Sequence, residues 1–236
     1  MFDPFGTAAG RFAEPAQGWP HPIHPGWPES TPSVLLPPSE ALAEGGEVRL
    51  RPLLRKDGAD WRQQRIADEE FLRPVEPTMP TTWRDSHNQQ AWWSHLTQLR
   101  SAAREGIVVP CVIELDGRFV GQLTLGNIQH GGIAECWIGY WVYSQVHKAG
   151  VATAACGLGV DHAFSRMGLH RVTATFMPEN PGSRKVLVAN GFRHEGYLRR
   201  ALHINGAWRD HHLMAIVRDD YRSTAVERLR EQGRIR

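Results

Sequence analysis

The chain has few of the features that mark secreted or metal-binding proteins. Its 236 residues include only three cysteines, and Cys111, Cys136 and Cys156 lie far apart in apolar stretches. This pattern is typical of buried thiols in a cytoplasmic protein, and it lacks the close cysteine spacing of zinc sites. The 12 histidines, His211 and His212 among them, also lack the companion spacings of a zinc site, so we predict no metal.

Long apolar runs and strong charge are missing as well. No apolar stretch approaches the roughly 18 residues that a membrane-spanning helix needs, and the opening sequence MFDPFGTAAG has neither the basic patch nor the apolar core of a signal peptide. The formal net charge is only +2, without the basic stripe typical of non-specific nucleic-acid binding. We therefore expect a cytoplasmic protein that binds neither membranes nor nucleic acids directly.

Proline is concentrated at the start of the chain. Nine of the 16 prolines fall within residues 1–46, where hydrophobic periodicity is absent. Proline cannot donate a hydrogen bond to a strand, and such a segment buries little apolar surface to offset its ordering entropy. We predict an irregular arm over residues 1–46, a folded domain over 47–218, and a charged tail over 219–236 that forms a frayed helix.

The folded part follows a mixed pattern of strands and helices. The predicted order is a strand at 48–53, a helix from about 58 to 70, a helix ending near 104, strands at 108–115, 118–128 and 134–143, a helix from 151, a strand at 169–177, a helix ending near 190, and strands at 192–200 and 210–217. This order predicts an α+β fold with a mostly antiparallel sheet and one parallel crossover.

The crossover lies between Ile138 and Phe164, and the other elements are arranged around it. A strand of alternating apolar and aromatic residues stops at the sequence SQVHKAG, and an Ala- and Gly-rich helix follows. The first amides of a helix have no intrahelical partners, and its dipole favours negative charge there. Ala149, Gly150 and Ala152 keep side chains out of the way. The turn therefore predicts an anion site, most simply for a phosphate.

The same turn resembles the GNAT (Gcn5-related) N-acetyltransferases, over roughly residues 47–218. That superfamily carries a loop of the form Q/R-x-x-G-x-G/A, which grips the pyrophosphate of acetyl-coenzyme A. Here the loop reads HKAGVA from His147 to Ala152. Gly150 and Ala152 fit the pattern, whereas His147 replaces the usual Gln or Arg and Lys148 stands where relatives often have Gly.

Three further segments make the resemblance specific. They are IGYWV before the loop, Asn180-x-x-Ser183 followed by NGF, and EGYLR followed by INGAWRDHHL, all in the right order and spacing. Together they resemble the RimJ/RimL branch, which acetylates the N-terminal α-amine of ribosomal proteins. The INGAWRDH and VEPT segments are most similar to RimJ-type ribosomal-protein-alanine acetyltransferases. The resemblance implies acetyl-coenzyme A as co-substrate and a protein N-terminus, such as that of a ribosomal protein, as acceptor.

The resemblance also assigns residues to the cofactor. The assigned residues are Val142, His147, Lys148, Ala149, Gly150, Val151, Ala152, Thr153, Asn180 and Ser183. In the RimJ/RimL branch the serine contacts the coenzyme sulfur and serves as general acid toward the leaving thiolate. The simpler alternative is that Ser183 or Asn180 only caps the following helix.

A general base is harder to assign from the sequence. RimL-type relatives carry a Glu at the position that is Leu202 here. Glu76 and Glu135 are the best carboxylate candidates, and His203 is a weaker one. An α-amine has a pKa of about 7.7–8.0, against about 10.4 for lysine, so a weak base or a water chain suffices for direct attack on the thioester.

The sequence therefore predicts an N-acetyltransferase that acts on a protein N-terminus, with Trp83 and Trp141 as possible walls of the acceptor site. Two alternatives stay open. One is an acetyltransferase for a small amine such as an antibiotic or a polyamine, and the other is an acyl-coenzyme A-binding protein without catalysis.

Overall fold

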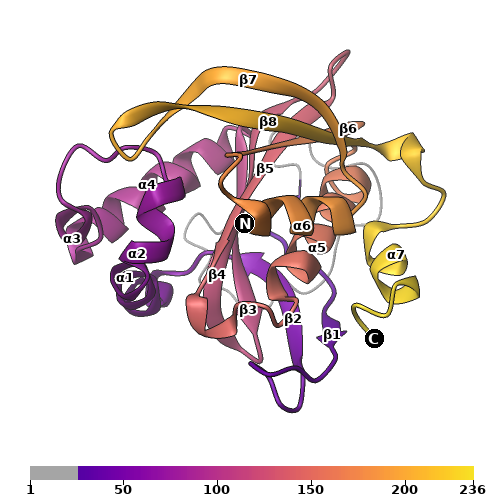
Figure 1. Cartoon of the computed structure of the whole chain (residues 1–236), viewed down its shortest axis with the longest axis horizontal. Coiled ribbons are helices and arrows are strands. Elements are labelled where there is room, and N and C mark those ends of the chain that lie inside the picture. Colours follow the sequence, from indigo (N-terminus) through magenta and orange to yellow (C-terminus); the bar gives the residue numbers. More distant parts are fainter. Residues whose placement is uncertain (1–25) are drawn as a thin grey trace.

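An eight-stranded mixed sheet organises the part of the chain that the computed structural model describes, residues 26–236 (Figure 1). Its strands are β1 (Val34–Leu36), β2 (Gly46–Pro52), β3 (Val108–Leu115), β4 (Arg118–Gln129), β5 (Glu135–Val142), β6 (Arg171–Phe176), β7 (Arg193–Ile204) and β8 (Ala207–Val217). The order across the sheet is β1-β2-β3-β4-β5-β6-β8-β7, and all neighbours are antiparallel except β5 and β6. The predicted α+β fold with one parallel crossover is confirmed.

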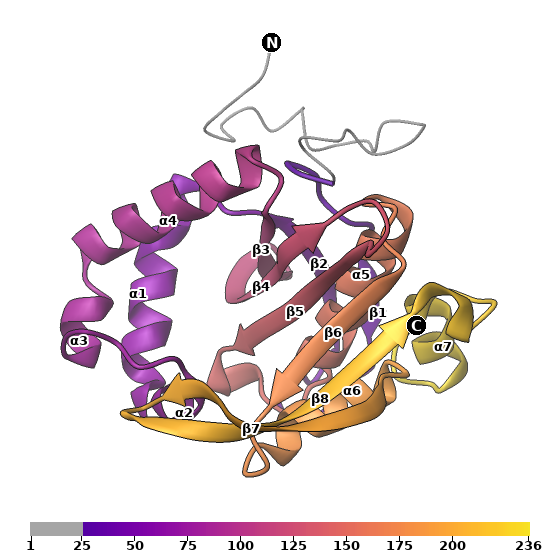
Figure 2. The same ribbon diagram turned by 90° about the horizontal axis from the view of Figure 1, so that it is seen from above.

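Helices cover both faces of this sheet. They are α1 (Gly58–Ala67), α2 (Glu69–Leu72), α3 (Trp83–Ser86), α4 (Gln89–Arg104), α5 (Val151–Ser165), α6 (Pro181–Ala189) and α7 (Ala225–Glu231). Figures 1 and 2 show α1 to α4 on one side of the sheet and α5 to α7 on the other. The predicted helix from 58 to 70 is divided at Asp68, which ends α1 and precedes α2.

The two sides of the sheet have separate apolar cores. The alternation of β5 directs Cys136, Ile138 and Val142 into the large core beneath α5. The opposite face carries a smaller core, in which Trp61 and Trp92 pack against the sheet. Among residues 26–236, none of the helices combines the length and hydropathy needed to cross a bilayer.

The structure differs from the predicted irregular arm over the described part of residues 1–46. β1 pairs antiparallel with β2, and Trp27, Val34 and Leu36 are buried in the large core. The ring of His162 on α5 donates from Nε2 to the carbonyl of Gly26 at 2.8 Å. These scattered apolar residues, without helical or strand periodicity, are sufficient to attach the segment to α5. The first 25 residues of the predicted arm lie outside the described residues.

The C-terminal tail over residues 219–236 also differs from the prediction, because α7 is packed rather than frayed. Ala225 and Leu229 are buried against α5. The carboxylate of Asp161 on α5 accepts hydrogen bonds from the amides of Ala225 at 2.7 Å and Val226 at 3.0 Å. This carboxylate satisfies the open amides at the start of α7, and a helix N-terminus favours negative charge.

Candidate active site

The two parallel strands separate towards their carboxyl ends. β5 and β6 pair only where Glu135–Trp137 lie opposite Arg171–Thr173. Beyond that point β5 stays paired with β4 as far as Val142, and β6 stays paired with β8 as far as Phe176. The facing edges of β5 and β6 therefore have no partner strand in this part of the sheet. An extended ligand with amide groups can lie between them and satisfy backbone groups that no strand satisfies.

The turn between β5 and α5 has the backbone of an anion site. Lys148 and Gly150 both have left-handed backbones, with φ of +63° and +87°, and Gly150 is the N-cap of α5. Among residues 26–236, no backbone or side-chain acceptor bonds to the amides from Lys148 to Thr153. These amides and the start of α5 form the kind of positive concavity that binds phosphate groups. The residues present thus fit the coenzyme A pyrophosphate.

The unusual residues of this loop have structural explanations. Lys148 adopts the left-handed conformation that glycine adopts freely, at a cost of about 1–2 kcal/mol for a non-glycine residue. His147 is exposed, and its Nε2 donates to the carbonyl of Val142 at 2.8 Å. The imidazole therefore braces the loop against the end of β5. The ring of Phe71 in α2 lies edge-on to it at 6.1 Å.

Asp68 anchors the other side of the same loop, and sequence analysis did not identify it. Its buried carboxylate accepts from the amide and from the hydroxyl of Ser144, both at 2.6 Å. Ser144 begins the short 3-10 turn, Ser144–Val146, that leads from β5 into the loop. The break between α1 and α2 thus places this carboxylate at the end of β5. The helix predicted from about 58 to 70 runs through Asp68, and no local pattern indicates this contact.

Asn180 and Ser183 lie together at the start of α6, which follows β6, whereas the anion loop follows β5. The side-chain oxygen of Asn180 accepts from the amide of Ser183 at 3.0 Å, so Asn180 caps the helix. The hydroxyl of Ser183 lies 3.4 Å from the hydroxyl of Tyr140 on β5. Burial raises the pKa of the Tyr140 phenol. Sequence analysis placed Tyr140 in the strand but gave it no role.

Glu76 lies at the same carboxyl end of β5 and belongs to a cluster around a buried arginine. Arg65 donates to Glu76 at 2.6 Å, and its guanidinium lies between the rings of Trp83 and Trp141, 5.0 and 5.2 Å from their centroids. His87 accepts from Arg65 Nε at 3.0 Å and donates from Nδ1 to the carbonyl of Trp83 at 2.7 Å. Burial lowers the pKa of His87 to about 4, so the ring is neutral at pH 7. We call these five residues the Arg65 cluster.

The structure does not bring Glu135 to this region. Glu135 is the first residue of β5, where the strand is still paired with β6, and its carboxylate lies 2.7 Å from Nε of Arg171. Arg171 also pairs with Glu195, and this pairing lowers the pKa of Glu195. Tyr140 is five positions further along the strand, about 17 Å at strand rise. Glu135 therefore belongs to an ion-pair cluster that connects β5, β6 and β7.

β7 carries the remaining base candidate, His203, next to Leu202. Leu202, at the position where RimL-type relatives carry Glu, is exposed beside a bulge in the strand. His203 shares a hydrogen bond of 2.8 Å between its Nδ1 and the hydroxyl of Thr78, which also accepts from the amide of Gly206 at 2.7 Å. His203 and Thr78 thus attach the β7–β8 hairpin to the loop after α2.

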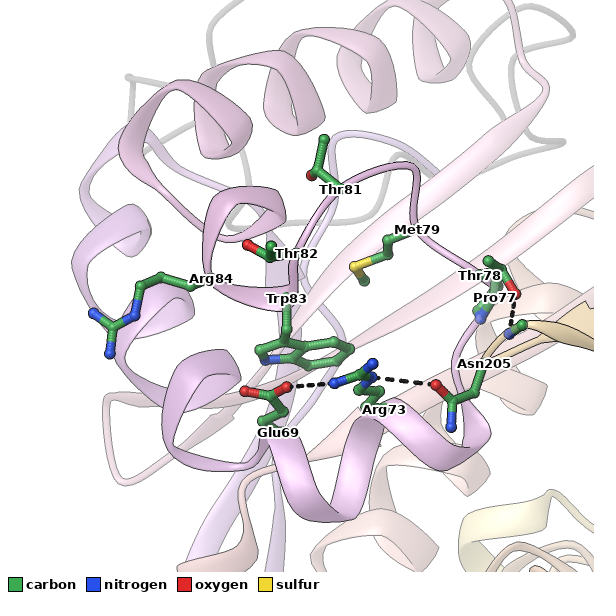
Figure 3. Close-up of a pocket in the computed structure, with 11 residues that line it drawn as sticks. Glu69, Arg73, Pro77, Thr78, Met79, Thr81, Thr82, Trp83, Arg84 and Asn205 are labelled. Carbon is green, nitrogen blue, oxygen red and sulfur yellow. Dashed lines mark hydrogen bonds and ion pairs between the residues drawn. The ribbon is translucent and has the colours of Figure 1, made fainter.

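A cavity of about 420 Å³ lies where this loop meets the hairpin. Figure 3 shows its lining, in which Arg73 reaches between Glu69 and Asn205 while the ring of Trp83 forms one wall. The adjacent Asp68 contacts the end of β5, so the cavity lies on the same side of the sheet end as the Arg65 cluster. Among residues 26–236, no group of three or more His, Cys, Asp or Glu side chains is arranged to hold a metal ion.

Comparisons with known proteins agree with this geometry. Residues 47–193 match the acetyltransferase (GNAT) domain family. The structure is similar to RimJ of Mycobacterium smegmatis in complex with CoA-disulfide, with a TM-score of 0.86 and 46% identity over 90% of this chain and 99% of that one.

Two curated relatives extend the comparison. The chain is 28% identical to the [ribosomal protein uS5]-alanine N-acetyltransferase of Escherichia coli, over 64% of this chain and 77% of that protein. It is 40% identical to the probable N-acetyltransferase YjcK of Bacillus subtilis over 44% of this chain, a match that spans 58% of that relative's length. The fold, the loop before α5 and the family match lead to one conclusion: the chain belongs to the GNAT acetyltransferase family.

Proposed function

We propose that the protein transfers the acetyl group of acetyl-coenzyme A to the N-terminal α-amine of a protein, by direct attack of the amine on the thioester. The observation that carries this proposal is the meeting of three features at the carboxyl end of β5. They are the open amides of residues 148–153, the hydroxyl of Ser183, and the Arg65 cluster on the opposite face of the strand.

The loop provides the cofactor half of the site. The amides from Lys148 to Thr153 hold the pyrophosphate, and the exposed Lys148 side chain adds positive charge. Single helix-terminus interactions contribute only about 0.3–1 kcal/mol at exposed sites, so several amides act together. The unpaired edges of β5 and β6 receive the pantetheine arm, which leads the thioester towards Ser183 and Tyr140.

The Arg65 cluster provides the acceptor half. Arg65 holds the Glu76 carboxylate in place, and the Glu76 side chain is about a quarter exposed. A fixed carboxylate attracts an ammonium group and can take its proton, directly or through a water. About a tenth of an α-amine is already neutral at pH 7, whereas lysine is about 3.5 kcal/mol further from losing its proton. A modest base suits an α-amine.

The similarity to the E. coli and M. smegmatis proteins supports a protein acceptor of the ribosomal type. The cavity beside Trp83 gives room for the residues that follow the acetylated amine. Its lining mixes the apolar Met79 and Pro77 with hydroxyl groups and the cations Arg73 and Arg84. Such a lining suits a short peptide with small or polar side chains better than it suits a fully apolar ligand.

The test is an assay of thiol release from acetyl-coenzyme A with matched acceptors. A peptide that begins with Ala should be acetylated, and the same peptide with a blocked N-terminus but an internal Lys should not. Spermidine and an aminoglycoside serve as small-amine acceptors. Turnover on these two alone would replace the proposal with a small-amine acetyltransferase. Tight binding of acetyl-coenzyme A without turnover on any amine would indicate an acyl-coenzyme A-binding protein.

A further inference from the structure

Tyr140 occupies a position that the proposed function leaves unexplained. It lies on β5 three residues beyond Trp137, the last residue of the strand that pairs with β6. Strand alternation puts its side chain on the same face as Ile138 and Val142, towards α5 and α6. Ser183 approaches from the first turn of α6. The two hydroxyls therefore reach towards each other from opposite sides of the separated strands, to 3.4 Å.

The backbone amide and the hydroxyl of Ser183 each have one hydrogen-bond partner among the described residues. Its amide donates to the capping oxygen of Asn180, which fixes the backbone. Its hydroxyl has Tyr140 as its hydrogen-bond partner. A serine hydroxyl has one proton and two lone pairs. When Tyr140 donates to one lone pair, the proton of Ser183 must point away from the ring, which leaves it available to a third group between the strands.

We propose that Tyr140 is a positioning residue for Ser183: its phenol donates to the Ser183 oxygen and so directs the Ser183 proton towards the leaving sulfur. The inference rests on the proposed function, in which Ser183 is the general acid. The new C–N bond forms as the amine attacks the carbonyl carbon, and the C–S bond breaks with its electron pair on sulfur. Ser183 gives its proton to that sulfur and regains one from water, while the amine loses its own proton to Glu76 or water.

The surroundings of Tyr140 suit a donor that keeps its proton. Burial raises the pKa of its phenol and so favours the neutral form. A neutral O–H in a water-poor site stabilises the partial negative charge that develops on Ser183 as its proton moves. Buried donors that are already oriented need no reorganisation during the reaction. Tyr140 thus increases the acidity of Ser183 without entering the proton balance.

The test begins with Tyr140→Phe, which removes only the hydroxyl. We expect kcat to fall about tenfold, while the KM for acetyl-coenzyme A and the Kd of coenzyme A stay within about twofold. Tyr221→Phe is the matched control, because that hydroxyl also makes one hydrogen bond, to the carbonyl of Gly191 at 3.2 Å, but lies at the far end of α6. Tyr221→Phe should leave kcat, KM and Kd unchanged.

A double variant separates positioning from a structural role. If Tyr140 acts through Ser183, Tyr140→Phe should cause no further loss in a Ser183→Ala background. Equal losses in both backgrounds would overturn the proposal, and so would a wild-type kcat in Tyr140→Phe or in Ser183→Ala. A higher Kd for coenzyme A with unchanged kcat would also overturn it. Circular dichroism and thermal unfolding confirm that each variant is folded.

A second reaction tests the role of Tyr140 without any acceptor amine. Slow hydrolysis of acetyl-coenzyme A without any amine also breaks the C–S bond and needs a proton on sulfur. If the wild type acetylates no peptide but Tyr140→Phe and Ser183→Ala both slow this hydrolysis non-additively, the positioning role stands and the proposed acceptor fails. If peptide acetylation is normal in Tyr140→Phe, the acceptor stands and the positioning role fails.

Discussion

The two ends of β5 have opposite properties, although the strand is only eight residues long. At the amino end the strand pairs with β4 and β6, and Glu135 is held by Arg171 in an ion-pair cluster with Glu195. At the carboxyl end the β6 side of the strand has no partner strand, and backbone amides, a hydroxyl pair and the Arg65 cluster converge there. We refer to these as the closed end and the open end.

The comparison shows that strand pairing, more than residue type, decides where chemistry is possible. Glu135 and Glu76 are both carboxylates held by arginine, with side chains about equally exposed. The carboxylate at the closed end lies beside satisfied backbone and serves to fasten strands together. The one at the open end is held by Arg65 near Trp141, in the part of β5 whose β6 side has no partner strand. Residue type alone does not distinguish these two carboxylates as candidate bases.

The largest effect is expected from filling the loop at the open end. Gly150→Glu introduces a side chain at φ +87° and places negative charge among the amides that we propose hold the pyrophosphate. We expect affinity for coenzyme A to fall by more than about 100-fold by calorimetry. Gly150→Ala is the control, because its Cβ would meet only Leu36 at 3.5 Å, and it should weaken binding much less. Unchanged affinity in Gly150→Glu would mean that the cofactor binds elsewhere.

An intermediate effect is expected from neutralising one carboxylate at each end. Glu76→Gln should reduce kcat on an Ala-terminated peptide by about tenfold, since a hydrogen bond to a charged group contributes about 1.5–3 kcal/mol. Glu135→Gln should leave kcat within about twofold and lower stability by at most about 1 kcal/mol, because the pair is partly exposed. Steady-state kinetics and urea unfolding of both variants give the comparison. A reversed order of the two kcat values would assign the base to the closed end.

The last effect is expected from acid, which should act on the two ends at different pH values. The pKa of His87 is about 4 in the folded chain and about 6.5 when unfolded. The unfolded state therefore binds more protons between these values. The contribution of the neutral His87 ring to the free energy of unfolding is complete above about pH 6.5. It decreases towards pH 4, by up to about 1.4 kcal/mol per pH unit.

The closed end responds only at lower pH. Arg171 lowers the pKa of Glu195 in the folded chain, so this pairing stabilises the protein above the unfolded pKa of about 4.3 and is lost as pH falls through the folded pKa. Urea unfolding at pH 7, 6 and 5 should show a smaller loss of stability in His87→Gln than in the wild type. Glu195→Gln should differ from the wild type by a constant amount over the same range. Parallel curves for His87→Gln and the wild type would contradict the assignment.

Sequence patterns were sufficient for the fold because local rules and tertiary packing agree in most of the chain. The alternation from Ile138 to Val142, the break at Gly150 and the stop at Asn190–Gly191 each specify one element. The arm from Gly26 onward and α7 were misjudged for one reason. Their few apolar side chains have no periodicity of their own, and their stability comes from a distant helix, α5.

The candidate site was predictable where it depends on the backbone. Small residues and a strand-to-helix turn indicated the anion loop from Ala149 to Ala152, and the structure puts open amides there. Side-chain partners from distant elements were not predictable. Asp68 acts on the loop across 76 positions of sequence, and Tyr140 meets Ser183 across 43. No local pattern encodes such pairs, and none indicates that Arg171 binds Glu135 or that Arg65 binds Glu76.

The three buried cysteines have a consequence for resistance to oxidation. Burial raises the pKa of Cys111 and Cys136 to about 12 and that of Cys156 still further. The thiolate is the form that attacks disulfides and peroxides, and almost none is present at neutral pH. Cys156 is near enough to Tyr140 to influence its ionisation, so it lies close to the place where the proposed reaction would release a free thiol. An enzyme with this chemistry can release coenzyme A turnover after turnover, while its own thiols stay poor nucleophiles toward any coenzyme A disulfide that an oxidant forms.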